Sequence, residues 1–218
     1  MNVLMAILVA LSGAAHLLGE YFGWMPVIYV CKPLTMLLII AMAIGKQKRV
    51  PKFYGYLILM GLGFSLIGDV LLMVPRDLFL YGLVSFLVAQ ICYIVAFRRG
   101  VKIRLTLLVM PFALFGILMY WLLWPGLEQM KIPVLLYLII ILLMGWLAAE
   151  RHTKLPNRFT RWAAVGAVLF IISDAILAVN RFRFDFAFST YLVMISYYFA
   201  QWLIASSIDE EASRGGNL

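Results

Sequence analysis

Five ionisable side chains interrupt long apolar stretches of this chain. Asp69, Asp174 and Lys32 lie inside such stretches, and His16 and Glu20 lie near the end of another. A charged side chain at the centre of a bilayer costs about 2.5–3.5 kcal/mol on insertion scales, so residues of this kind usually mark a functional site. Two carboxyl groups in a low-dielectric cavity suit acid–base chemistry, because one can hold a proton while the other stays ionised beside a lysine.

The composition places most of the chain in lipid. Of its 218 residues 65% are hydrophobic and 13% charged, and the mean hydropathy is +1.01. A globule of this length lacks the interior to bury so much apolar surface, which excludes an ordinary soluble domain, a disordered chain and a disulfide scaffold. Cys31 and Cys92 are expected as packing residues, and two histidines argue against a metal site.

Eight apolar runs are long enough, or nearly so, to cross a bilayer as helices. They lie at residues 2–19, 26–44, 53–74, 78–97, 104–123, 131–149, 160–180 and 186–207. The first run lacks a basic flank and a cleavage site, so we expect a retained span rather than a signal peptide. Because helices satisfy their own backbone groups in lipid, the sequence predicts an all-α, polytopic eight-helix membrane bundle. It forms one domain over 1–208, and a mobile cytoplasmic tail is expected over 209–218.

Basic residues in the connections predict the orientation of this bundle. One side holds twelve of them, namely Lys46, Lys48, Arg49, Lys52, Arg98, Arg99, Lys102, Arg104, Arg151, Lys154, Arg158 and Arg161. The other side holds four, namely Arg76, Lys131, Arg181 and Arg183. The positive-inside rule therefore predicts both termini in the cytoplasm and the protein in the cell (inner) membrane. The same rule explains the net charge of +8, so no nucleic-acid partner is expected.

The five ionisable residues share one depth when the spans are laid out in this orientation. Asp69 lies roughly 7–8 Å below the outer boundary at about 1.5 Å per residue, and the other four fall in the same outer layer. Polar side chains that flank this layer or lie below it are candidates for a cavity wall. They are Gln90, Tyr93, Ser173, Asn180, Ser196, Tyr197 and Gln201. Tyrosine and glutamine can donate hydrogen bonds to carboxylates and so help set their pKa.

The surroundings of the two aspartates echo each other. Residues 68–72 (GDVLL) resemble residues 173–177 (SDAIL), and at the same offset Tyr93 matches Tyr198. Four helices separate the copies, so both would have the same orientation in the membrane. This pattern suggests a parallel four-plus-four repeat.

Two other functions stay open on the residues alone. A proton-coupled small-molecule or lipid carrier would use Asp69 and Asp174 as a proton relay, but it needs a polar path to both sides. A receptor-like or assembly bundle would use Lys32 and one aspartate as a buried ion pair that fixes helix register. Serine hydrolase, zinc protease and nucleotide-binding motifs are absent from the sequence.

These residues carry a resemblance to a known family. Lys32-Pro33-Leu34, residues 68–72, residues 173–177 and Ala200-Gln201 resemble the YhhN family of integral-membrane lysoplasmalogenases. The resemblance covers nearly the whole chain, including the eight-helix layout. Gln90 departs from the pattern, because a histidine is expected there in many relatives.

The resemblance implies hydrolysis of the vinyl ether bond of a lysoplasmalogen. The products would be a fatty aldehyde and glycerophosphoethanolamine or glycerophosphocholine. It implies a lysophospholipid substrate, surrounding membrane lipid, no cofactor and no metal. Asp69 and Asp174 would be the catalytic pair. The expected substrate-binding or pKa-tuning residues are Lys32, Glu20, His16, Gln90, Tyr93, Asn180, Tyr197 and Gln201.

Overall fold

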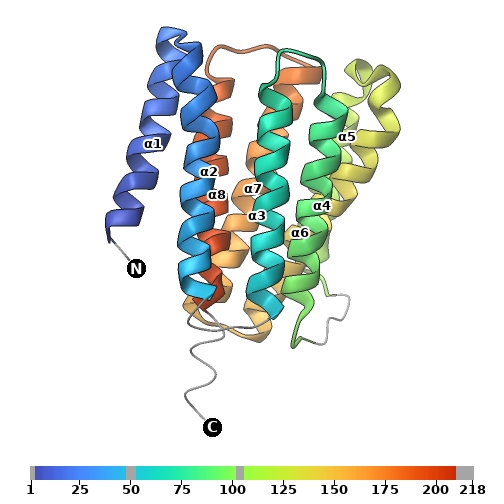
Figure 1. Ribbon diagram of the computed structural model, residues 1–218. Coiled ribbons are helices and arrows are strands. Elements are labelled where there is room, and N and C mark those ends of the chain that lie inside the picture. The colour runs from blue at the N-terminus through green and yellow to red at the C-terminus, as the bar shows by residue number, and fades with distance from the viewer. Residues whose placement is uncertain (1–2, 48–52, 102–105, 210–218) are drawn as a thin grey trace.

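The part of the chain that the structure describes folds into eight long α-helices that run alternately up and down (Figure 1). The structure is a computed structural model that describes residues 3–47, 53–101 and 106–209. The helices are α1 (Val3–Phe22), α2 (Met25–Gln47), α3 (Phe53–Met73), α4 (Phe79–Arg98), α5 (Val109–Leu123), α6 (Lys131–Lys154), α7 (Arg158–Phe182) and α8 (Ser189–Ser206). The predicted all-α class is confirmed, and the observed bounds agree closely with most of the predicted runs. The fifth helix begins later than predicted, with Pro111 in its first turn, where proline is well tolerated.

Seven of the eight helices are long and apolar enough to cross a membrane. The exception is α8, which has 18 residues and carries tyrosines, serines and Gln201. These polar side chains lower its mean hydropathy without shortening its path, since α8 runs beside the other helices through the height of the bundle (Figure 1). The protein is therefore a polytopic membrane bundle in which α8 carries polar groups into the interior.

The start of α1 and the end of α8 lie at the same end of the bundle (Figure 1). Of the twelve basic residues predicted on one side, Lys46, Arg98, Arg99, Arg151, Lys154, Arg158 and Arg161 are described, and they lie at this same end, at helix termini or within a turn of them. Outside the described residues lie Lys48, Arg49, Lys52, Lys102, Arg104 and residues 210–218 of the tail that was predicted over 209–218.

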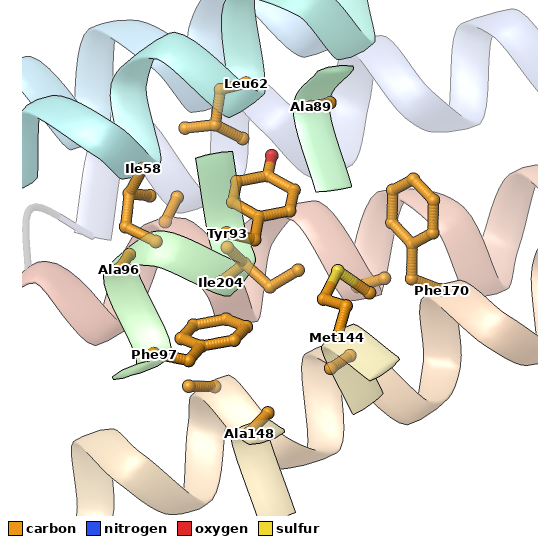
Figure 2. Close-up of a cluster of buried hydrophobic side chains, with 14 of the residues drawn as sticks. Ile58, Leu62, Ala89, Tyr93, Ala96, Phe97, Met144, Ala148, Phe170 and Ile204 are labelled. Carbon is orange, nitrogen blue, oxygen red and sulfur yellow. The ribbon is translucent and has the colours of Figure 1, made fainter. Parts of the chain in front are cut away.

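Apolar side chains from α3, α4, α6, α7 and α8 meet in one core (Figure 2). Tyr93 and Phe97 of α4 stack at 6.3 Å between ring centroids, and Met144 and Phe170 are also fully buried. In lipid this packing stabilises the bundle by dispersion contacts rather than by removal of apolar surface from water. The two cysteines are free, with Cys92 buried and Cys31 half-buried.

Two helix pairs pack most closely, α3 with α4 and α7 with α8. Glycine makes this approach possible in each pair. A Cβ on Gly68 would lie 2.7 Å from the ring of Phe86, and a Cβ on Gly166 would lie 2.9 Å from the carbonyl oxygen of Ala200. Small residues at helix contacts are typical of membrane bundles. These two pairs hold Asp69 and Asp174 at fixed positions on α3 and α7.

Candidate active site

A polar cavity of about 190 Å³ lies between α2, α3, α4, α7 and α8. Its wall includes Lys32, Asp69, Asp174, Asn180 and Tyr197, which are five of the residues singled out in the sequence. Ser173 also lies on this wall, but its hydroxyl donates to the carbonyl oxygen of Val193 on α8. The structure therefore brings both aspartates and the lysine, from three different helices, to one cavity.

Asp69 is buried and has two polar partners in the cavity. The hydroxyl of Tyr197 donates a hydrogen bond of 2.6 Å to Oδ2, and Nζ of Lys32 lies 4.0 Å from Oδ1. Only 4% of the surface of residue Asp69 is exposed, whereas 15% of the surface of the Lys32 side chain is exposed. Lys32 therefore supplies a positive charge that can balance an ionised Asp69, and Tyr197 fixes the orientation of the carboxylate.

Asp174 is half-buried and has a different environment. The hydroxyl of Tyr137 on α6 donates a hydrogen bond to its Oδ2. Among the described residues, Asp174 forms no ion pair with a lysine or arginine. The two carboxyl groups thus differ in how a negative charge on them is balanced, because Asp69 faces an ammonium group and Asp174 faces a neutral hydroxyl. This difference matters for acid–base chemistry.

Asn180 reaches the cavity near the end of α7, where it also shapes the backbone. Its Oδ1 accepts a hydrogen bond of 3.2 Å from the backbone amide of Phe186. This contact holds the connection between α7 and α8, which continues into Ser189 and Thr190 on the cavity wall. Asn180 therefore helps to position the polar rim of the cavity.

His16 and Glu20 are close to each other but do not line this cavity. His16 is fully buried, and its Nε2 lies 3.4 Å from Oε1 of Glu20. Its Nδ1 lies 3.2 Å from the hydroxyl of Tyr198. The reason is their place on α1, which packs against α2 and α8 and lies outside the ring of helices that forms the cavity.

Gln90, Tyr93 and Gln201 are fully buried but do not line the cavity either. The hydroxyl of Tyr93 donates a 2.9 Å hydrogen bond to Oε1 of Gln201, which ties α4 to α8. Neither amide atom of Gln90 has a hydrogen-bond partner among the described residues. Ser196 also points elsewhere, since its hydroxyl donates to the carbonyl of Leu192 in its own helix.

Tyr137, which does not line the polar cavity but contacts Asp174 from the neighbouring pocket, was not predicted as a site residue from the sequence. A tyrosine inside a span attracts little attention, because aromatic residues are common in membrane helices. One signal was available. Tyr137 precedes Asp174 by 37 residues, the spacing at which Lys32 precedes Asp69. Within the suggested repeat, Lys32 and Tyr137 occupy equivalent positions and contact equivalent aspartates.

A metal would need a cluster of suitable ligands. In the three described stretches of the chain, no group of three His, Cys, Asp or Glu side chains is arranged to hold one. The carboxyl pair itself offers a proton donor, a negative charge for a developing cation and a base for water, which are the needs of acid-catalysed hydrolysis.

Comparison with known proteins places this chain among membrane proteins of one family. The model of the YhhN family matches residues 27–208. The chain is 36% identical to human lysoplasmalogenase TMEM86A over 194 residues, which cover 86% of this chain and 80% of the human protein. It is 30% identical to the uncharacterized membrane protein YhhN of Escherichia coli O157:H7 over 188 residues, covering 83% and 86% of the two chains.

A shorter match connects the chain to a mycobacterial enzyme. The lysoplasmalogenase of Mycobacterium bovis is 34% identical over 129 residues, which cover 54% of this chain and 47% of that protein. No solved structure matches the chain significantly.

Proposed function

Because the chain belongs to the YhhN family, and because relatives of similar length are named lysoplasmalogenases, we propose that it hydrolyses the vinyl ether bond of lysoplasmalogens. The substrate class is an alkenyl-glycerophosphoethanolamine or alkenyl-glycerophosphocholine. The products are a fatty aldehyde and the matching glycerophosphodiester. The observation that carries the proposal is the pair Asp69 and Asp174 on one intramembrane cavity, each with a different partner.

The unequal partners support a division of roles. Asp174, which faces Tyr137 and has no ion-pair partner among the described residues, acts as the acid and donates its proton to the vinyl carbon distant from oxygen. The double bond becomes a single bond, and an oxocarbenium ion forms at the adjacent carbon. Asp69, whose charge is balanced by Lys32, stays ionised and stabilises this cation.

Water completes the reaction. It adds to the carbon of the oxocarbenium ion and gives up a proton to a carboxylate, forming a hemiacetal. The hemiacetal hydroxyl then gives up its proton as the bond to the glycerol oxygen breaks, the glycerol oxygen takes up a proton, and the aldehyde is released. One water is consumed and the carboxyl groups regain their starting protonation. Because Asp69 and Asp174 act as a coupled pair of carboxyl groups, the roles of acid and base belong to the pair as much as to either residue. No step requires a metal or a cofactor.

Neighbouring side chains hold these groups in place. Tyr197 and Tyr137 orient the two carboxyl groups, and Lys32 also lies where it can meet the substrate phosphate. Arg181 is already engaged at the surface, since its guanidinium lies 2.9 Å from Asp77 and above the ring of Phe79. Arg181 therefore serves better as an interfacial anchor than as a headgroup ligand.

The proposal includes the placement of the bundle in the cell membrane. The described basic residues gather at the end where α1 begins and α8 ends, and the positive-inside rule favours the cytoplasm for that end. In this orientation the chain crosses the membrane eight times, and the cavity opens in the outer half of the bilayer. The matching pairs α3–α4 and α7–α8, with Lys32 and Tyr137 at equivalent positions, support a four-plus-four repeat.

The test is release of aldehyde from a lysoplasmalogen by the purified protein, with and without chelator. We expect chelator-resistant turnover that falls by at least about a hundredfold in Asp69→Asn and in Asp174→Asn, as for loss of an essential acid or base. Asp185→Asn is the matched control, because Asp185 is an exposed carboxylate outside the cavity wall. Well-folded wild-type protein that releases no aldehyde from either headgroup class would overturn the proposal.

A further inference from the structure

The polar cavity continues into a narrow apolar pocket. This second pocket has a volume of about 60 Å³ and lies between α3, α4, α5, α6 and α7. Four residues line both spaces, namely Leu72, Phe86, Asp174 and Leu177. Apart from Asp174 and Tyr137, the pocket wall is aliphatic and aromatic. This apolar lining suits a hydrocarbon chain better than a charged phosphate headgroup.

Phe86 is a fixed wall between the two spaces. Gly68 leaves room for its ring, which packs edge-on against Phe170 at 6.1 Å and Tyr197 at 6.0 Å between centroids. A chain in the apolar pocket would therefore pass Phe86 on the side of Asp174. Its first carbons would lie beside the carboxyl that the proposed mechanism uses as the acid.

The apolar pocket adjoins a groove on the outside of the bundle. Leu138 lines both the pocket and this groove, which has a volume of about 710 Å³ and lies between α5 and α6. Helix α5 is the least embedded of the bundle, since only Gly116 and Leu123 are buried in it. Its outer surface carries large exposed side chains such as Ile117 and Trp121. A helix with so few packed residues can move aside more easily than the tightly packed α3, α4, α7 and α8.

A second membrane-facing groove is an alternative place for the hydrocarbon chain. It lies between α1 and α8, has a volume of about 400 Å³, and is lined by residues such as Ala14 and Trp202. No residue that lines it also lines the polar cavity. The α5–α6 groove shares Leu138 with the apolar pocket that Asp174 lines, and this link distinguishes it from the α1–α8 groove among the described residues.

We infer that the hydrocarbon chain of the substrate occupies the apolar pocket beside Asp174 and reaches the bilayer through the groove between α5 and α6. This inference rests on the proposed function, because it concerns the chain of the same single-chain lipid. It assigns Ala178, one turn beyond Asp174 on α7, as a residue that limits the space for the chain. Because the chain enters the pocket from lipid or detergent rather than from water, a blocked pocket acts through lost space and lost packing contacts.

The first experiment locates the chain without requiring turnover. A saturated 1-O-alkyl lysophospholipid with a diazirine near the end of its chain lacks the vinyl ether and is added to the wild-type protein. We expect labelling of α5 and α6 that excess unlabelled alkyl lysophospholipid removes. Competable labelling of α1 and α8, or no competable labelling, would overturn the inference. Labelling of α5 and α6 without any aldehyde release from lysoplasmalogen would refute the proposed function and leave the chain site intact.

The second experiment uses a matched pair of substitutions. Ala178→Phe fills the apolar pocket, and Ala14→Phe places the same ring in the α1–α8 groove. We expect Ala178→Phe to weaken binding of a long-chain alkyl lysophospholipid by about tenfold or more because the added ring occupies the space of the chain, with less than about a twofold change for Ala14→Phe. An unchanged affinity in folded Ala178→Phe, or a larger loss in Ala14→Phe, would contradict the assignment. If Ala178→Phe does not fold, the photolabelling of wild type decides.

Discussion

Tyr197 on α8 donates a 2.6 Å hydrogen bond to Asp69 on α3, although these two helices otherwise make little contact. The ring of Tyr197 has its own support, because it packs edge-on against Phe86 and Phe170, at 6.0 and 5.7 Å between centroids. Aromatic packing therefore places the ring, and the hydroxyl then orients the carboxylate. Removal of the hydroxyl alone should leave the ring where it is.

Tyr197→Phe should accordingly lower turnover more than stability. A hydrogen bond to a charged group contributes about 1.5–3 kcal/mol, so kcat is expected to fall about 10- to 100-fold if the carboxylate is held for catalysis. The thermal unfolding midpoint in detergent should change little. Tyr198→Phe is the control, since the hydroxyl of Tyr198 contacts His16 outside the cavity. Equal losses of kcat in the two variants would contradict a positioning role for Tyr197.

The pair formed by Lys32 and Asp69 predicts an interaction between two substitutions. Loss of one partner of a buried ion pair lowers the free energy of unfolding by about 3–5 kcal/mol. The loss in Lys32→Met should lie near the lower end of this range, because Lys32 is not fully buried. Lys32→Met combined with Asp69→Asn removes both charges and should recover much of the lost stability without recovering turnover. Thermal unfolding of the four proteins gives the coupling energy. Additive effects would mean that the two side chains do not balance each other.

The sequence predicted the bundle well because its main signals are local. Apolar runs and the breakers between them determine where helices begin and end, so α2, α3 and α4 were predicted nearly to their ends. The expected common depth grouped Asp69, Asp174 and Lys32, and all three line one cavity, although their catalytic and binding roles stay a prediction. The late start of α5 at Val109 was not predicted, because apolar content extends beyond the helix itself.

Depth alone does not say which helix faces which. His16 and Glu20 were predicted at the depth of the aspartates, but their helix α1 is not one of the helices that form the cavity wall. Which helices form that wall depends on packing between segments that are distant in the sequence. Gln90 and Gln201 were expected on the cavity wall and are instead buried beneath it among core residues. Tyr137 was missed for the converse reason, since its importance comes from its contact with Asp174 and not from its residue type.

The fit between Gly68 and Phe86 predicts opposite effects for two glycine substitutions in α3. A Cβ at Gly68 would lie 2.7 Å from the ring of Phe86, whereas a Cβ at Gly63 meets nothing within 4 Å. Gly68→Ala should therefore destabilise the protein by about 1–3 kcal/mol and lower turnover, because Phe86 must shift and Tyr197 packs on it. Gly63→Ala should be neutral or stabilise by up to about 1 kcal/mol through helix propensity. Unfolding midpoints and aldehyde release measure both effects, and a stable, fully active Gly68→Ala would show that the contact is unimportant.

The crossing by α8 is a prediction that chemical labelling can decide. Its 18 residues include the polar side chains that face the interior, so its composition alone does not identify a span. In a background of Cys31→Ala and Cys92→Ala, Asp185→Cys between α7 and α8 should react with a membrane-impermeant maleimide in intact cells. Arg158→Cys, and a cysteine added after the last residue, should react only after permeabilisation. Labelling of both Asp185→Cys and the added cysteine in intact cells would contradict an eighth crossing, and the reverse pattern would contradict the predicted orientation.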